Sequence, residues 1–199
     1  MFHLFYLCPS LLKKFKKNYL SSTSNKIRRC NKPEANQKIQ FFKSPTFVYN
    51  RQNIKFHICS IFNQLNLNKK INTSLFINCC ASEFDVPGCI AIYGNDDDLS
   101  LDLNLIKINR ILNLINDFKN QPNKTFNVYI NCWMGCSRSV GFCILLLLML
   151  DENTTTNETV PNHFNFYYKL LRIKRPGIAI TESLKKKVIQ FVQNNKKQV

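Results

Sequence analysis

Along residues 50–195, two kinds of hydrophobic pattern take turns, one typical of strands and one typical of helices. Short runs of β-branched and aromatic residues predict strands at 55–60, 73–79, 89–93 and 126–130. Apolar residues at helical spacing, or in a solid leucine-rich block, predict helices at 103–118, 140–150, 165–174 and 182–193. Because strands alternate with helices, the pattern predicts an α/β sandwich with a central, largely parallel sheet flanked by helices.

Charge divides the chain into two parts. Residues 1–49 contain ten Lys or Arg residues and one Glu, so they carry +9 of the formal net charge of +16. We expect a poorly ordered basic tail at 1–49 and one folded domain at 50–199, a length that can hold a single core. The leucine-rich block at 140–150 has about half the length needed to cross a bilayer, so we expect no transmembrane helix.

The basic tail allows several roles. A solvated tail is the commonest outcome for such charge runs. The stretch 11–17 could instead form a basic amphipathic helix on an anionic membrane, or a docking arm for an acidic groove on a kinase. A mitochondrial address also fits a basic segment that contains serine and few acidic residues.

The segment from Cys132 to Ser139 carries the clearest chemical signal. It reads Cys-Trp-Met-Gly-Cys-Ser-Arg-Ser and lies where a predicted strand meets a predicted helix. Backbone N–H groups and the positive end of a helix dipole bind a dianion there and lower the pKa of a nearby thiol. Arg138 would offer a planar fork of donors to two phosphoryl oxygens, and Gly135 would let the backbone approach the anion. The competing interpretation is a buried Cys and a solvated Arg that are spaced this way by chance.

Asn131 to Ser139 resembles the signature His-Cys-x-x-Gly-x-x-Arg-Ser of the dual-specificity protein phosphatases, within the Cys-x5-Arg phosphatase superfamily. The resemblance implies that phosphotyrosine and phosphoserine or phosphothreonine are hydrolysed through a phosphocysteine, with no metal or cofactor. It makes Cys132 the nucleophile and assigns Ser139 to the stabilisation of the departing thiolate. The phosphate-binding residues implied by the loop are Trp133, Met134, Gly135, Cys136, Ser137 and Arg138.

The family's general acid is an aspartate after a short upstream strand, and three adjacent residues compete for this role. Alignment on Ile90 and Ile92 favours Asp96, with Asp97 second, whereas counting back from Cys132 favours Asp97 or Asp98. Three neighbouring carboxylates raise one another's pKa, which would help one of them stay protonated near neutrality. The other interpretation is an acidic turn before a helix.

Two positions depart from the family pattern. Asn131 replaces the histidine that helps to order the loop, so we expect a weakened rather than abolished site. Ile180-Thr181 replaces a frequent Pro-Asn, which puts the local support of the loop in question.

Composition narrows the substrate and the compartment. Trp133, Met134 and Cys136 are uncharged, which suits a phosphorylated side chain of a protein, and we expect no specific nucleic-acid partner. Because the chain is strongly basic, RNA 5′-phosphate or a phosphoinositide is an alternative substrate. Because Asn131 replaces the usual histidine, a catalytically weak, phosphate-binding pseudophosphatase is an alternative function. Nine cysteines without metal-finger spacing, one of them a thiolate, indicate a reducing compartment. We expect the cytoplasm, with the nucleus and, through the tail, the mitochondrion as alternatives.

Overall fold

The structure is a computed structural model that describes residues 45–61, 63, 74–81, 88–94, 101–119, 121, 123–154 and 158–196. Residues 1–44 and the three candidate acids, Asp96, Asp97 and Asp98, lie outside the described residues.

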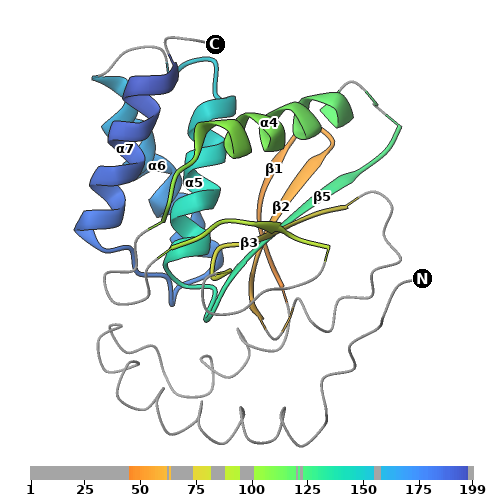
Figure 1. Cartoon of the computed structure of the whole chain (residues 1–199), viewed down its shortest axis with the longest axis horizontal. Coiled ribbons are helices and arrows are strands. Elements are labelled where there is room, and N and C mark those ends of the chain that lie inside the picture. The colour runs from red at the N-terminus through yellow and green to blue at the C-terminus, as the bar shows by residue number, and fades with distance from the viewer. Residues whose placement is uncertain are drawn as a thin grey trace, which may run out of the picture.

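A five-stranded mixed sheet forms the centre of the domain (Figure 1). Its strands lie in the order β1-β2-β5-β3-β4. β2, β5, β3 and β4 run parallel, whereas β1 pairs antiparallel with β2 at the edge of the sheet. The strands span β1 Thr46–Arg51, β2 Ile54–Ser60, β3 Ser74–Asn78, β4 Ile90–Ala91 and β5 Phe126–Cys132.

The described helices gather on one side of the sheet, as Figure 1 shows. α5 packs on β5 and β2, contacts α4 and α6 beside it, and is covered by α7. Every residue of α5 from Arg138 to Leu148 is buried, because eight of them are large apolar residues or Cys143 and the helix is enclosed by its neighbours. The helices span α4 Leu105–Lys119, α5 Arg138–Leu150, α6 Thr159–Lys174 and α7 Glu182–Asn195.

Alternate strand residues point to the opposite face of the sheet, where four rings form a row across four strands. The ring centroids of Phe47 and His57 lie 5.7 Å apart, and those of His57 and Tyr129 lie 4.5 Å apart. Phe76 stacks on Tyr129 with centroids 5.1 Å apart. All three pairs are direct partners in the strand register, so the row helps to fix that register.

The structure confirms the predicted fold class and extends several elements. β1 was not predicted, although Thr46-Phe-Val-Tyr alternates as a strand should, because these residues follow directly on the basic segment. β4 is shorter than predicted, since only Ile90 and Ala91 pair with β3. α6 begins at Thr159 rather than 165, with Pro161 in its first turn, where a missing N–H costs nothing. In the described part of the chain, no helix is both long and apolar enough to span a membrane.

Candidate active site

The candidate site lies at the end of β5, where three parallel strands end at the same edge of the sheet. Cys132 is the last residue of β5 and is the register partner of Ser60, the last residue of β2. Asn131 is the partner of Asn78 at the end of β3. Ligand sites of open α/β sheets form outside such carboxyl ends, so the topology places Cys132 where a substrate can reach the fold.

The loop that follows Cys132 turns sharply into α5. Gly135 has a φ of +68°, in the left-handed region that favours glycine. A Cβ on this residue would lie 2.6 Å from the backbone oxygen of Cys59, so a larger side chain would also push the loop off β2. α5 begins at Arg138, two residues earlier than predicted, so Arg138 and Ser139 form its first turn. The first-turn N–H groups of α5, which have no acceptor within the helix itself, and its positive dipole end therefore lie at the predicted anion site.

The thiol of Cys132 is set apart from its neighbours by its electrostatic surroundings. Burial by itself raises the pKa of Cys132, but the Arg138 charge and hydrogen bonds outweigh this effect, and the pKa lies below the ordinary value. The donors of these bonds are the Ser139 hydroxyl, with Oγ 3.2 Å from Sγ, and the backbone N–H groups of Ser139 and Ser137. Burial is the largest influence on Cys59 and Cys143, and it raises the pKa of both thiols. Cys132 is thus suited to be a thiolate nucleophile.

Arg138 is the loop's own cation. Its side chain is only 2% exposed although it carries a full charge, and this charge is the largest favourable influence on the Cys132 thiolate. A buried guanidinium next to a thiolate, at a helix N-terminus, provides the charge that a bound dianion needs.

The other residues of the loop are uncharged and differ in their contacts. Trp133 packs against Ile61 and Cys80. The thiol of Cys136 donates to the carbonyl oxygen of Met134 at 3.5 Å, which holds it within the loop. Ser137 is 8% exposed, and its hydroxyl has no hydrogen-bond partner among the described residues. The loop therefore adds no cation besides Arg138.

Asn131 ties β5 to β3. Its side-chain Nδ2 donates to Oδ1 of Asn78 at 2.9 Å, and the same Oδ1 accepts the backbone N–H of Cys80 at 3.1 Å. Both asparagines are fully buried. Asn131 thus supports the base of the loop through a buried amide pair, in the position where the resembling family has a histidine.

A second support, which the sequence analysis missed, comes from the segment between α6 and α7. Arg175 is 1% exposed and donates from Nε to the Gly135 carbonyl at 2.8 Å and from Nη2 to the Met134 carbonyl at 3.3 Å. Ala179 N–H donates to the Cys136 carbonyl at 2.9 Å. In the sequence, the only feature that distinguishes Arg175 is its position before Pro176-Gly177, and this feature does not predict that its side chain is buried. Thr181 serves as the N-cap of α7, where its hydroxyl accepts the Leu184 N–H at 3.2 Å.

The acid candidates follow β4, which is parallel to β3 and has its carboxyl end at the same edge as Cys132. The described residues on either side of them come together, because Asp102 N–H donates to the Tyr93 carbonyl at 2.7 Å. The choice between Asp96, Asp97 and Asp98 stays a prediction, since all three lie outside the described residues.

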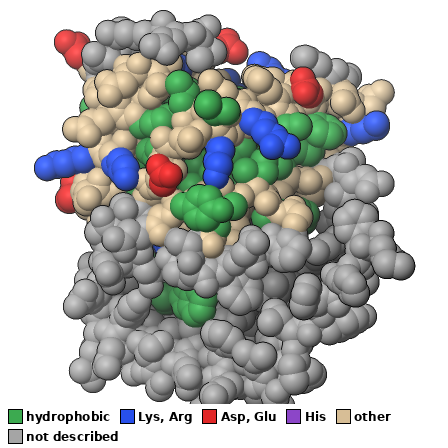
Figure 2. Space-filling model, viewed as in Figure 1, with side chains coloured by type: hydrophobic (Ala, Val, Ile, Leu, Met, Phe, Trp, Pro, Cys, Tyr) green, Lys and Arg blue, Asp and Glu red, His purple; other side chains and the backbone are tan. Residues whose placement is uncertain are grey.

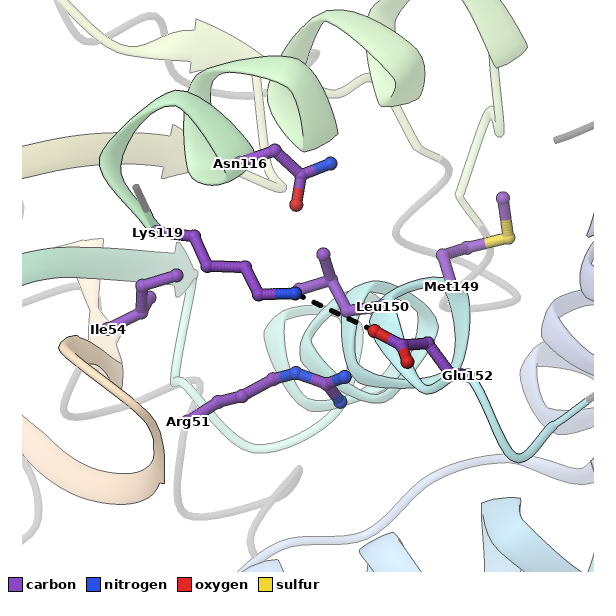
Figure 3. Close-up of a pocket in the computed structure, with 7 residues that line it drawn as sticks. All are labelled: Arg51, Ile54, Asn116, Lys119, Met149, Leu150 and Glu152. Carbon is purple, nitrogen blue, oxygen red and sulfur yellow. Dashed lines mark ion pairs between the residues drawn. The ribbon is translucent and has the colours of Figure 1, made fainter. Parts of the chain in front are cut away.

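A cavity in the structure lies far from this chemistry (Figure 3). It includes Ile54, the first residue of β2, whereas Cys132 lies beside the last residue of the same strand, about 20 Å away at the usual rise per residue. Lys119 and Glu152 form an ion pair of 3.6 Å across it. The cavity is lined by Arg51, Ile54, Asn116, Lys119, Met149, Leu150 and Glu152.

Two other kinds of site find no support in the described residues. No group of three His, Cys, Asp or Glu side chains there is arranged to hold a metal ion. Figure 2 shows that the Lys and Arg side chains on the described part of one face are separated by hydrophobic, acidic and other side chains. A continuous basic groove, as nucleic-acid binding requires, is therefore not seen on that face.

Comparison with known proteins agrees with this geometry at the level of fold. No family model and no curated protein matches the sequence. Among solved structures, DUSP15 is 13% identical with a TM-score of 0.52 and covers 78% of this chain and 91% of its own. PTPMT1 is 10% identical with a TM-score of 0.51 and covers 77% and 96%.

A leucine-rich repeat and phosphatase domain containing protein from Entamoeba histolytica is similar to the same extent. It is 14% identical with a TM-score of 0.50, over 79% of this chain and 95% of its own. At such identities the likeness concerns the backbone arrangement. The chain therefore has the α/β fold of the dual-specificity and protein tyrosine phosphatases.

Proposed function

We propose that this protein is a protein phosphatase that hydrolyses phosphotyrosine and phosphoserine or phosphothreonine through a phosphocysteine intermediate. The observation that carries the proposal is the environment of Cys132. A thiol with a lowered pKa lies at the base of a loop that ends in a helix N-terminus, next to the buried Arg138. These groups serve as nucleophile and oxyanion site for phosphoryl transfer.

The mechanism has two steps. In the first, the thiolate of Cys132 attacks phosphorus in line, the S–P bond forms, and the bond to the leaving oxygen breaks. Arg138 and the loop N–H groups hold the equatorial oxygens, and Asp96, or Asp97 as the second choice, gives a proton to the leaving oxygen. In the second, the same aspartate takes a proton from water, which attacks phosphorus and releases phosphate. The Ser139 hydroxyl, 3.2 Å from Sγ, stabilises the thiolate as it leaves.

Substitution of the nucleophile tests the proposal directly. Cys132→Ser is expected to abolish hydrolysis of p-nitrophenyl phosphate while tungstate, a tetrahedral oxyanion, still binds, because the serine hydroxyl is not ionised near neutrality. Mass spectrometry of the quenched wild-type reaction should find phosphate on the peptide that contains Cys132. Turnover of Cys132→Ser near the wild-type rate would contradict the proposal.

The acid is tested by the pH dependence and by the leaving group. Asp96→Asn should remove the basic limb of the pH–rate profile and slow substrates with poor leaving groups most, since these need the proton. Asp97→Asn serves as the matched comparison. Equal and mild effects of both substitutions would mean that neither residue is the acid.

The substrate class follows from the composition of the loop. Trp133, Met134 and Cys136 add no positive charge around the phosphate, which favours a phosphorylated side chain over a polyanionic headgroup. A panel of phosphopeptides, phosphoinositides and 5′-triphosphorylated RNA tests this point through kcat/KM. A clear preference for either of the last two would replace the protein substrate, and oxyanion binding without any turnover would make the chain a pseudophosphatase.

A further inference from the structure

We infer that Arg175 is a positioning residue that, together with the Ala179 N–H, aims the anion-binding N–H groups of the loop. The inference deepens the proposed function, because it concerns the same phosphate site. It follows from the contacts on the outside of the loop, where three consecutive carbonyl oxygens, those of Met134, Gly135 and Cys136, all bond to the segment 175–179.

Peptide geometry links these outer contacts to the inside of the loop. In a trans peptide the C=O of one residue and the N–H of the next point in opposite directions. The described chain has no cis peptide bond. Fixing the carbonyls of Met134 and Gly135 toward Arg175 therefore turns the N–H groups of Gly135 and Cys136 away from it.

The third peptide shows where these groups point. Ala179 N–H holds the carbonyl of Cys136, whose peptide partner is the N–H of Ser137. That N–H is one of the donors that lower the pKa of Cys132. The outer bond and the inner bond thus belong to one peptide plane, and the outer bond fixes the direction of the inner one.

Arg175 is suited to this role by shape as well as charge. Its planar guanidinium reaches two loop carbonyls, and its Nη1 donates to the hydroxyl of Thr46 on β1 at 2.6 Å. Lysine would bring a single ammonium group, which cannot copy this fork. The space is also tight, since a Cβ on Gly135 would lie 2.8 Å from Nη2 of Arg175. The guanidinium therefore sets the position of the loop against β1 and β2.

The test compares Arg175→Lys with wild type in the full chain. We expect tungstate to bind about tenfold more weakly, or worse, because aligned N–H donors are what hold an oxyanion. The pKa of Cys132, measured as the pH dependence of its alkylation by iodoacetamide, should rise. If wild type hydrolyses p-nitrophenyl phosphate, kcat/KM should fall with tungstate affinity. Arg172→Met, three residues earlier and exposed on α6, is the matched control and should leave all three values unchanged.

Two further outcomes keep the test decisive. If Arg175→Lys does not fold, Thr46→Val removes only the anchor on β1 and should shift tungstate affinity and thiol pKa in the same direction by a smaller factor. Folded variants with wild-type tungstate affinity and thiol pKa would overturn the inference. A wild-type protein that binds tungstate but hydrolyses nothing would contradict the proposed function alone, since the binding and alkylation measurements need no turnover.

Discussion

At the scale of single residues, a comparison of the buried cysteines distinguishes the effect of burial on a thiol pKa from the effect of nearby charges and hydrogen bonds. Cys79, Cys132 and Cys143 are all buried, yet the pKa is raised for Cys79 and Cys143 and lowered for Cys132. Burial acts in the same direction on all three. The Arg138 charge lowers the pKa of Cys79 as well as that of Cys132, but at Cys132 hydrogen bonds from Ser137 and Ser139 add to its effect and the sum outweighs burial. The loop, rather than the position in the core, lowers the pKa of this thiol, as the proposed nucleophile requires.

Ser139→Ala tests one of these contributions. The Ser139 hydroxyl stabilises the thiolate form of Cys132 more than the neutral thiol. Without this donor, the pKa of Cys132 should rise toward its ordinary value. The acidic limb of the kcat/KM profile, which reports ionisation of the nucleophile, should then move to higher pH. Ser183→Ala on the exposed side of α7 is the matched control. An acidic limb that stays in place would show that Ser139 acts only on the departing thiolate.

At the scale of elements, the sequence predicts what is local and misses what is distant. The loop from Cys132 to Ser139 could be recognised because the proposed nucleophile and the cation belong to one short segment between a strand and a helix. Arg175 lies 40 residues from the carbonyl of Gly135 that it holds, and no spacing rule connects them. The buried pair of Asn131 and Asn78 is separated by 53 residues and is equally hidden from a search for local patterns.

β1 was missed for a different reason. Its alternation of Thr46, Phe47, Val48 and Tyr49 is short, and it follows a strongly basic segment, so charge outweighed periodicity in the prediction. Pairing with β2 decides the matter in the fold, because an edge strand needs only one partner. Regular periodic helices such as α4 and α7 were predicted to within two residues at each end.

The turn within the loop can be tested through its glycine. Gly135→Ala meets two obstacles, a φ of +68° and the Cys59 carbonyl oxygen at 2.6 Å. The backbone conformation alone should lower the free energy of unfolding by about 1–2 kcal/mol. The displaced loop should reduce kcat/KM on the order of 100-fold. Thermal unfolding and p-nitrophenyl phosphate hydrolysis measure the two effects.

Gly177→Ala is the matched comparison for that substitution. Gly177 has no positive φ, and a Cβ there meets no atom within 4 Å, so stability should stay the same or rise slightly. If Gly135→Ala had the same small effects as Gly177→Ala, the prediction that the loop at Gly135 has no room for a Cβ next to β2 would be wrong.

At the scale of the whole molecule, charge and catalysis are expected to occupy different parts of the chain. The cradle is built from β5, its loop and α5, with support from the segment 175–179. Residues 1–44 contain all eleven charged residues of the basic tail and therefore its +9. Charges on such a segment act by screened, long-range attraction, which weakens as salt rises. We propose that the tail serves location or partner choice, through an anionic membrane or an acidic surface of a kinase.

Two truncations place the boundary between these parts. Residues 45–199 should hydrolyse p-nitrophenyl phosphate like the full chain but bind anionic vesicles more weakly, with less dependence on salt.

The second truncation, residues 50–199, also lacks Thr46, the anchor of Arg175, and Val48, which is 2% exposed in the core. Loss of Val48 alone should cost about 1.5–3 kcal/mol of stability. The shorter chain should therefore unfold at a lower temperature and bind tungstate more weakly. Equal stability and turnover of the two truncations would show that the domain does not need β1, and low turnover of a folded 45–199 chain would make the tail part of the catalytic unit.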